Sequence, residues 1–314
     1  MKHHPNSPSA LGRQYHCPGS LREESGLPDS SGEAAAEGTK LHEYAAEILS
    51  GNLRLSSIPE HDRDLVESAV IFAEEHLHVP PGDFPRVEEM LSLAGPGGEE
   101  ISYGFADAMS YIDGTAHVVD HKFGYKPLDE ATATLQIAAY TAAAMQKVDA
   151  DRGSGSLFMP RLHRIYSAEI TREELPGVLE KIEAVIARTL DPSAPLKPGD
   201  HCQYCRALGL CDATRDATRE IAELVPAAAA APTAKEAKAA IVEEVRRWPA
   251  ELIAEIMPSV ELARMASDAV RSRLRECLDQ DPDCVPGYRL RETNGARTAN
   301  ASKLFDRLVH EPMG

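Results

Sequence analysis

One dipeptide near the middle of the chain constrains its fold more than any other feature. Asp113-Gly114 separates two β-prone runs, Met109–Ile112 and Ala116–Val119. An Asp-Gly pair between such runs is a strong signal for a two-residue hairpin, because both residues tolerate the positive φ angles of that turn. We therefore expect an antiparallel β-hairpin at the centre of the fold.

The segments around this hairpin alternate between β-prone and helical patterns. Further strands are predicted at 86–93, 101–105, 156–159 and 164–170, and helices at 33–49, 62–77, 131–146 and 171–190. Gly38 interrupts the first helix, so we expect its proper start at Thr39, a good N-cap residue. Thr171 and Glu174 form a capping box that opens the last helix. These elements predict an α/β fold with a mixed central sheet and flanking helices.

Both ends of the chain differ from this central part. The first thirty residues are rich in Ser, Pro and Gly and are expected to be irregular. Residues 226–240 are Ala-rich and fit either a linker or a weak helix, and a helix at 258–280 and a short strand at 287–291 follow. We therefore expect one domain at 1–225 and a mainly helical C-terminal extension at 226–314.

The composition narrows the class of protein. The 314 residues are 43% apolar, and no apolar run reaches the length that crosses a bilayer. The N-terminus lacks a hydrophobic signal core, so we expect a cytoplasmic protein without a membrane partner. A formal charge of −17 argues against nonspecific coating of nucleic acid. It does not argue against an enzyme that acts on nucleic acid, because carboxylates that bind a divalent cation belong in such a site.

The chemically informative stretch is Gly104-Phe105-Ala106-Asp107, followed thirteen residues later by Asp120-His121-Lys122. In a hairpin, Asp107 and Asp120 come from neighbouring strands, and strand alternation places Asp120 and Lys122 on one face. Two carboxylates and an ammonium group suit metal-assisted phosphodiester hydrolysis. Taken alone, the D-x-K triplet favours a solvated strand end with a surface ion pair, because such a triplet occurs by chance in many chains.

Two further motifs change that balance. His42 ends the run Gly38-Thr39-Lys40-Leu41-His42, and Gln136 and Tyr140 lie four residues apart on the helix after the D-x-K strand, so they share a helix face. The order G-T-x-x-H, G-x-A-D, D-x-K and Q-x-x-x-Y resembles the RecB-type branch of the PD-(D/E)XK nucleases. With Cys17-Pro18-Gly19-Ser20, the chain is most similar to a phage and prophage group of that branch, over roughly residues 15–215.

This resemblance implies a restriction-endonuclease-like core and a role for each motif residue. It implies a DNA exonuclease that uses Mg²⁺ or Mn²⁺ and serves recombination or DNA processing, in a bacterial host cell if a phage encodes it. A single-strand annealing protein or another recombination protein is an implied partner. Ala106 replaces the Pro of the family's name motif. The implied metal ligands are His42, Asp107 and Asp120; the catalytic residues are Asp107, Asp120 and Lys122; the DNA contacts are Gln136 and Tyr140.

The remaining acidic and histidine residues near these motifs are expected to matter less. Glu88 fits either a position near the metal or a surface carboxylate. His121 must point away from Asp120 and Lys122, so it is expected to be packed or solvent-exposed. The other histidines considered are expected to be structural: His16, His163 and His201.

Four cysteines form a separate constellation. Cys202-x2-Cys205-x5-Cys211 groups three thiols within ten residues, and Cys17 stands far upstream. The spacing alone fits zinc or an iron–sulfur cluster. The one-plus-three pattern around the nuclease motifs resembles the [4Fe–4S] site of AddB and CRISPR adaptation nucleases, and implies a structural cross-link. Two cysteines fall outside the pattern and are expected to be free thiols: Cys277 and Cys284.

Three functional readings follow from the sequence. The first is the metal-dependent DNA exonuclease. The second is a catalytically silent DNA-binding or scaffold module that keeps the fold and the four-cysteine site. The third is a zinc-containing interaction protein in which the acidic motif is coincidental. The intact set of Asp107, Asp120 and Lys122 favours the enzyme.

Overall fold

The computed structural model describes residues 4–27, 33–224 and 232–290. The chain divides into two compact units, Met1–Ser267 and Asp268–Gly314. All of the strands and all of the motifs discussed above belong to the first unit. The boundary that we expect near residue 225 stays a prediction.

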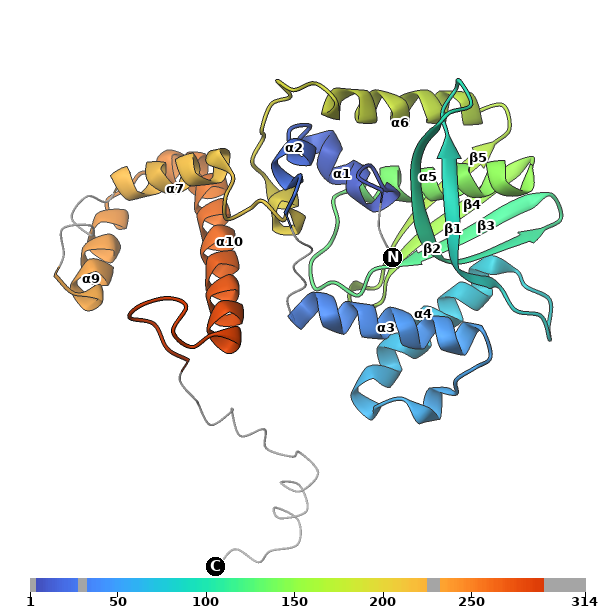
Figure 1. Cartoon of the computed structure of the whole chain (residues 1–314), viewed down its shortest axis with the longest axis horizontal. Coiled ribbons are helices and arrows are strands. Elements are labelled where there is room, and N and C mark those ends of the chain that lie inside the picture. The colour runs from blue at the N-terminus through green and yellow to red at the C-terminus, as the bar shows by residue number, and fades with distance from the viewer. Residues whose placement is uncertain (1–3, 28–32, 225–231, 291–314) are drawn as a thin grey trace, which may run out of the picture. The chain divides into compact units, whose positions relative to one another are not determined.

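Five strands form a single sheet in the order β1-β2-β3-β4-β5 (Figure 1). Neighbouring strands are antiparallel except β3 and β4, which are parallel and are joined by a helical crossover. The predicted α/β class, with a mixed sheet flanked by helices, is confirmed. The strands are β1 (Arg86–Ala94), β2 (Glu100–Ile112), β3 (Thr115–His121), β4 (Arg152–Met159) and β5 (Arg164–Thr171).

The central hairpin forms as the Asp-Gly pair predicts. Asp113 has a φ angle of +49° and Gly114 one of +76°, and the flanking Ile112 pairs with Thr115. Two positive φ angles are characteristic of the tight turns that match the strand twist. The strand before the turn is longer than predicted, because the run at 101–105 continues without a break to Ile112.

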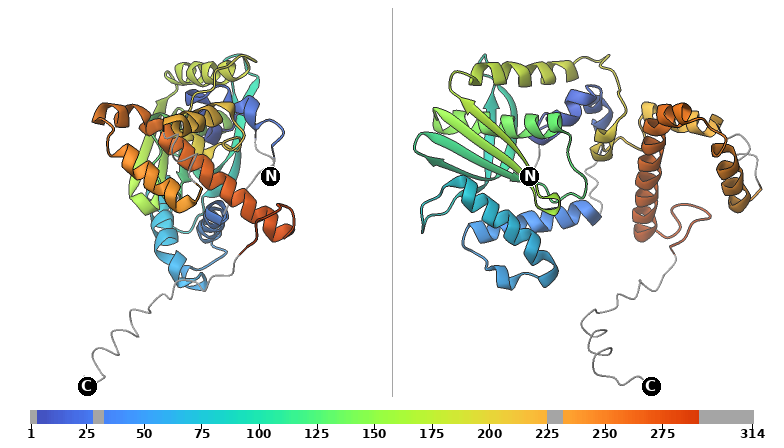
Figure 2. Two further views of the ribbon diagram at one scale, coloured as in Figure 1. Left: turned by 90° about the vertical axis from the view of Figure 1, so that its left-hand side faces the viewer. Right: turned by 180° about the vertical axis from the view of Figure 1, so that it is seen from behind.

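Helices cover both faces of the sheet, as Figures 1 and 2 show. On one face, α3 (Glu33–Leu49) and α4 (Glu60–Leu77) form a hydrophobic cluster with the sheet. On the other face, the cluster contains residues of α1 (Pro8–His16), α5 (Glu130–Val148) and α6 (Leu175–Thr189). Because Val118 and Val119 of β3 belong to opposite clusters, this central strand is buried on both sides.

The N-terminal region is not irregular, so that expectation is wrong. It contains α1 and a second helix, α2 (Ser20–Glu24). Leu11 of α1 is fully buried, and a Cβ at Gly12 would overlap Thr132 of α5. The absent side chain at Gly12 allows the two helices to approach closely, and this contact is invisible in a local reading of composition.

Two expectations about helix starts also need correction. Helix α3 runs through Gly38 without interruption. Thr171 and Glu174 make the reciprocal bonds of a capping box, with Thr171 N–H to Glu174 Oε2 at 3.0 Å and Glu174 N–H to Thr171 Oγ1 at 3.4 Å. However, Thr171 ends β5 and α6 begins at Leu175, so the bonds close the turn before the helix.

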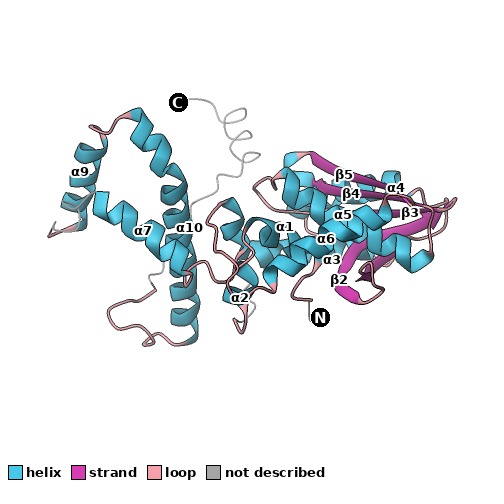
Figure 3. Ribbon diagram, turned by 90° about the horizontal axis from the view of Figure 1, so that it is seen from above, coloured by secondary structure: helices cyan, strands magenta, loops and turns pink. Residues whose placement is uncertain are grey.

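The C-terminal region in the described residues consists of helices and loops, as the colours of Figure 3 show. It contains α7 (Asp212–Leu224), α9 (Ala234–Val245) and α10 (Ala250–Gln280). Pro258 lies inside α10 rather than at its start. The strand expected at 287–291 is absent at residues 287–290, and Arg291 lies outside the described residues, as does part of the Ala-rich run.

Three short 3₁₀ helices complete the described elements: η1 (Leu55–Ser57), η2 (Pro160–Leu162) and η3 (Asp200–Tyr204). Among the helices that the structure describes, none has the length and apolar character needed to cross a membrane.

Candidate active site

The Asp120 carboxylate lies at the centre of the site. It is near the end of β3, with 3% of its side chain exposed. Its Oδ2 accepts a bond from Lys122 Nζ at 2.5 Å and a second from Gln136 Nε2 of α5 at 3.1 Å. The structure therefore brings together the D-x-K pair and the first residue of the Q-x-x-x-Y motif.

The second carboxylate, Asp107 on β2, binds a different set of groups. Its Oδ2 accepts the backbone N–H of His121 at 2.6 Å. His42 Nδ1 of α3 lies 3.1 Å from the same oxygen, and His121 Nδ1 lies 3.4 Å from it. The G-T-x-x-H histidine thus meets the G-x-A-D carboxylate across 65 positions of sequence, as the motif order predicts.

His121 has a larger role than the sequence indicates. Its side chain is 1% exposed, so it is packed, and its Nε2 contacts the backbone oxygen of Ala69 on α4 at 3.0 Å. Its Nδ1 is buried without a hydrogen-bond partner. The contact of His121 with Asp107 could not be anticipated from strand alternation, which gave only its direction away from Asp120.

Mutual charge sets the protonation of this cluster. Burial opposes ionisation of Asp107, but His42 and His121 outweigh it and hold the pKa of Asp107 well below its usual range. Burial raises the pKa of Asp120 despite the Lys122 ammonium beside it. The pKa values of Lys122 and His42 are both raised, because neighbouring carboxylates overcome the effect of burial.

Gln136 and Tyr140 line the inner side of the site and are 2% and 4% exposed. The pKa of Tyr140 is raised well above its ordinary value by burial and by Asp120 and Asp107. A Cβ at Gly104 would lie 2.9 Å from the Tyr140 hydroxyl, so the glycine of the G-x-A-D motif makes room for this ring. The predicted contact of Gln136 and Tyr140 with DNA stays a prediction.

Glu88 also belongs to this region. The register of β1 against β2 pairs Val87 with Ala108 and Glu89 with Ala106, which brings Glu88 beside Asp107. Burial and the Asp107 charge raise the pKa of Glu88, and its φ angle is +47°. A non-glycine residue in the left-handed region is strained, and such strain is common at functional sites. Glu88 is exposed and also lies beside Asp107, so its place near the carboxylates and its place at the surface are both observed.

A cavity of about 280 Å³ adjoins the cluster, and its lining includes His42, Lys122, Phe123 and Tyr204. Phe123 meets the His42 ring edge-on, at 5.0 Å between centroids. Tyr204 is a wall residue that the motif analysis did not single out. The signal was its place between two cysteines, in Cys202-Gln203-Tyr204-Cys205.

The four cysteines of the one-plus-three pattern line a second and much smaller cavity, of about 20 Å³. Backbone N–H groups point at the sulfurs: Lys197 to Cys17 Sγ at 3.3 Å, and Gly199 to Cys202 Sγ at 3.4 Å. Such bonds stabilise metal-bound thiolates. In the protein without metal, burial raises the pKa of Cys17 and of Cys202, and raises that of Cys205 to about 12.

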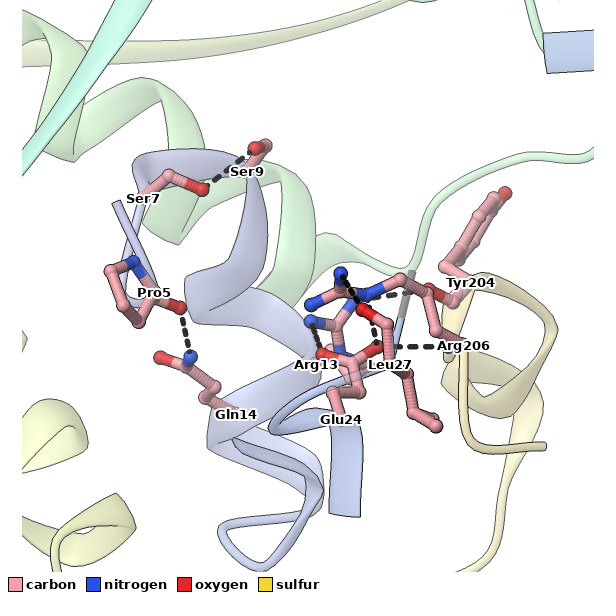
Figure 4. Close-up of polar contacts among 9 residues, drawn as sticks. All are labelled: Pro5, Ser7, Ser9, Arg13, Gln14, Glu24, Leu27, Tyr204 and Arg206. Atoms are coloured by element: carbon pink, nitrogen blue, oxygen red, sulfur yellow. Dashed lines mark hydrogen bonds and ion pairs between the residues drawn. The ribbon is translucent and has the colours of Figure 1, made fainter. Parts of the chain in front are cut away.

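A buried ion pair holds the cysteine loop against the N-terminal helices (Figure 4). Arg13 Nη2 bonds Glu24 Oε2 at 2.5 Å, and the two side chains are 15% and 3% exposed. Arg13 Nη1 also donates to the backbone oxygen of Tyr204 at 3.0 Å, and Glu24 Oε1 accepts the backbone N–H of Arg206 at 2.9 Å. This pair therefore fixes the backbone on both sides of Cys205.

The donors at both sites match the metals implied by the resemblance. Two carboxylates and an imidazole suit a hard divalent cation, and four thiols suit iron–sulfur or zinc. In residues 4–27, 33–224 and 232–290, no three His, Cys, Asp or Glu side chains are already grouped tightly enough to hold a metal ion. Either set would have to rearrange its side chains around the metal.

The remaining candidate residues lie outside the carboxylate cluster, and His201 lines the cysteine cavity. His16 contacts Asp129 Oδ1 at 2.9 Å and stacks on His201, which in turn contacts the backbone oxygen of Lys197. His163 is exposed after η2. Cys277 and Cys284 are free cysteines.

Comparison with known proteins places the chain in a family. The model of a family described as a protein of unknown function, DUF2800, matches residues 3–298. The chain belongs to the DUF2800 family. Solved structures similar to this DUF2800 chain include SSO0001, with 17% identity, a TM-score of 0.35, and coverage of 65% of this chain and 84% of that one. Another is a candidate exonuclease from Eubacterium rectale, with 13% identity, a TM-score of 0.39, and coverage of 66% and 86%.

Proposed function

We propose that this chain is a divalent-metal-dependent deoxyribonuclease of the RecB-like, PD-(D/E)XK type. One observation carries the proposal. His42 contacts Asp107, and Lys122 and Gln136 both contact Asp120. The backbone N–H of His121, the residue next to Asp120, donates to Asp107 and so brings the two sets together from four separate elements. A coincidental surface triplet would not bury its aspartate at 3% exposure or receive a hydrogen bond from Gln136 of α5.

The residues divide the work between them. Asp107, Asp120 and His42 are the ligands we assign to Mg²⁺ or Mn²⁺, which when bound polarises the phosphate and acidifies a water molecule. Lys122 stays protonated because neighbouring carboxylates raise its pKa. Its ammonium then offsets the negative charge that develops on the phosphate.

We assign a [4Fe–4S] cluster to the site of Cys17, Cys202, Cys205 and Cys211, with zinc as the competing occupant. Backbone N–H groups directed at the sulfurs support a metal of either kind. The cluster's role is structural, because it joins α1 and α2 to a loop almost two hundred residues away. The resemblance supports iron over zinc and supports a place in phage or prophage recombination, with an annealing protein as partner.

Digestion of end-labelled linear DNA and of covalently closed duplex circles tests the proposal. Linear DNA should be degraded only with Mg²⁺ or Mn²⁺, and closed circles should survive if the enzyme needs an end. Lys122→Ala should lower the rate by about 100-fold or more, the usual effect of removing a group that stabilises transition-state charge. Asp107→Ala should abolish cleavage.

His163→Asn provides a matched control, because it changes an exposed imidazole that does not line the cavity and should cleave at the wild-type rate. Undiminished cleavage by the Lys122 or Asp107 variant would contradict the site assignment. Equal rates on linear and circular DNA would remove the exonuclease assignment and keep the nuclease.

A further inference from the structure

The cavity beside the carboxylates has one wall that does not come from the nuclease motifs. His42 and Lys122 line it from α3 and from the end of β3, whereas Tyr204 lines it from the loop between Cys202 and Cys205. Tyr204 and Lys122 are close enough for the charge of each to shift the pKa of the other. The cysteine segment therefore reaches the catalytic cavity.

The structure holds Tyr204 in this position through its backbone. Arg13 Nη1 donates to the Tyr204 carbonyl oxygen, and the Arg13–Glu24 pair is buried. Figure 4 shows the Tyr204 ring extending away from this pair. Arg13 therefore holds the backbone of Tyr204 in place, while the Tyr204 ring lines the cavity.

The two aromatic rings in the cavity differ in what they offer. Phe123 is 5% exposed and packs against His42, so its ring is already occupied. Tyr204 is 48% exposed. An exposed aromatic ring next to a phosphate-binding ammonium group suits a nucleotide, because a nucleobase stacks on such a ring while its phosphate meets the charge.

We propose that Tyr204 is a substrate-contacting residue whose ring stacks on the unpaired nucleobase of the nucleotide at Lys122. This inference rests on the proposed nuclease function and adds a substrate class to it. Stacking needs a base with a free face, so the strand at the site is single-stranded at that nucleotide. Every base has such a face, so the contact does not select sequence.

Binding to oligonucleotides tests the stacking directly. Protein that carries its metal at the cysteine site is mixed with a single-stranded oligonucleotide in a buffer that contains Ca²⁺. The Ca²⁺ replaces Mg²⁺ at the carboxylates, so that the strand can be bound without being cut. A set of oligonucleotides, each with one abasic tetrahydrofuran residue, scans the strand position by position. One position should weaken wild-type binding by about 5-fold to 150-fold, the range expected for one base–aromatic stack.

Two variants at Tyr204 are compared with the wild-type protein on the same strands. Tyr204→Ala should lose the same factor on the intact strand and lose nothing further on the strand that is abasic at that position. Tyr204→Phe keeps the ring and should bind within about twofold of wild type. The assignment is overturned if no abasic position matters, if the Tyr204→Ala loss persists at every position, or if Tyr204→Phe loses as much as Tyr204→Ala.

The wild-type abasic scan shows by itself whether one base is stacked, and the comparison with Tyr204→Ala and Tyr204→Phe at that position assigns the stack to the Tyr204 ring. The readouts also separate the two proposals. Wild-type protein that cleaves DNA but binds all abasic strands equally overturns the Tyr204 assignment alone. Protein that shows the stacking position but cuts nothing with Mg²⁺ or Mn²⁺ overturns the nuclease and leaves Tyr204 as a binding residue.

Discussion

Asp107 is contacted by His121, the variable middle residue of the D-x-K motif. His121 contacts the Asp107 carboxylate through its backbone N–H and its ring, while its Nε2 is anchored on the Ala69 carbonyl of α4. Because the Ala69 carbonyl holds the His121 ring in place, the ring restricts the orientation of the Asp107 carboxylate that it contacts. Groups of this kind tune metal ligands without binding the metal.

His121→Asn removes the ring and keeps the backbone N–H, so it tests the ring alone. We expect the Mg²⁺ concentration for half-maximal cleavage to rise about 10-fold to 100-fold, the usual cost of losing a partner of a metal ligand. A titration of cleavage rate against Mg²⁺ measures this, with thermal unfolding as the check on folding. A metal requirement identical to that of wild type would show that the His121 ring is only a packing group.

Gly155 makes a second prediction at this scale, concerning stability. A Cβ at this position of β4 would overlap Thr141 Oγ1 and come within 2.9 Å of Ile137 on α5. Gly155→Ala should therefore destabilise the protein by about 1–3 kcal/mol, the usual cost of overpacking.

Gly177 supplies the matched substitution. It lies exposed in α6 with nothing near its would-be Cβ. Gly177→Ala should stabilise the protein by about 0.4–1 kcal/mol, because alanine restricts the unfolded chain. Chemical denaturation of both variants measures the difference, and a harmless Gly155→Ala would mean that β4 and α5 pack more loosely than described.

Among the helices, α5 has the most consequential start, because it carries Gln136 and Tyr140 and joins the two parallel strands. Asp129 is its N-cap: Oδ1 accepts the Thr132 backbone N–H at 3.0 Å and Oδ2 accepts the Thr132 hydroxyl at 2.6 Å. Burial opposes the charge on Asp129, but bonds from Thr132 and His16 hold its pKa below the ordinary value.

Asp129→Ala should cost about 1 kcal/mol near neutral pH, the typical value of an N-cap. A carboxyl whose pKa is lowered by folding contributes fully above its ordinary pKa of 3.8 and loses that contribution as the pH falls through its lower folded value. The difference between wild type and Asp129→Ala should therefore shrink in acid. Asp129→Asn keeps a cap acceptor and should lose less; an Asp129→Ala deficit that is constant down to pH 2 would contradict the assignment.

Elements with local signals could be predicted from the sequence, and those built on distant contacts could not. The hairpin followed from Asp113-Gly114, and the place of Asp120 and Lys122 on one face followed from strand periodicity. Helix α1 was missed because its stability comes from Leu11 and Gly12 packing on a helix more than a hundred residues later. The ring contact of His121 was missed for the same reason.

The candidate site also contains residues that could be predicted from the sequence and one that could not. The motif order anticipated which residues meet, because a family resemblance already contains long-range information. It gave no notice of Tyr204, whose position depends on how the cysteine loop lies against Arg13. A residue that lines a cavity but comes from a segment outside the motifs has no local sequence pattern that would identify it.

At the scale of the whole molecule, the metal that we propose at the four-cysteine site would join the N-terminal helices to the cysteine loop. We expect protein purified without oxygen to be brown, with about four irons per chain if the cluster is [4Fe–4S]. Cys202→Ala should lose the colour and much of the solubility together. Iron analysis and the visible absorption spectrum measure this.

Cys284→Ala is the matched control, because that exposed cysteine lies outside the pattern and its loss should leave colour and solubility unchanged. Colourless wild-type protein with one tightly bound zinc would contradict the assignment of iron–sulfur and would keep the assignment of a metal site to the four cysteines. Cys202→Ala protein with unchanged metal content would remove the site itself.

The link between Cys17 and the loop near Lys197 spans 180 positions, and this has a consequence for biosynthesis. A ribosome makes the first of the four cysteines early and the last three only after the whole sheet has been translated. The N-terminal helices must therefore wait, with Leu11 uncovered, until α5 has left the exit tunnel. The proposed metal would then be inserted late in the synthesis of the chain, and a cell short of that metal would accumulate chains with a folded sheet and N-terminal helices that are not joined to the cysteine loop.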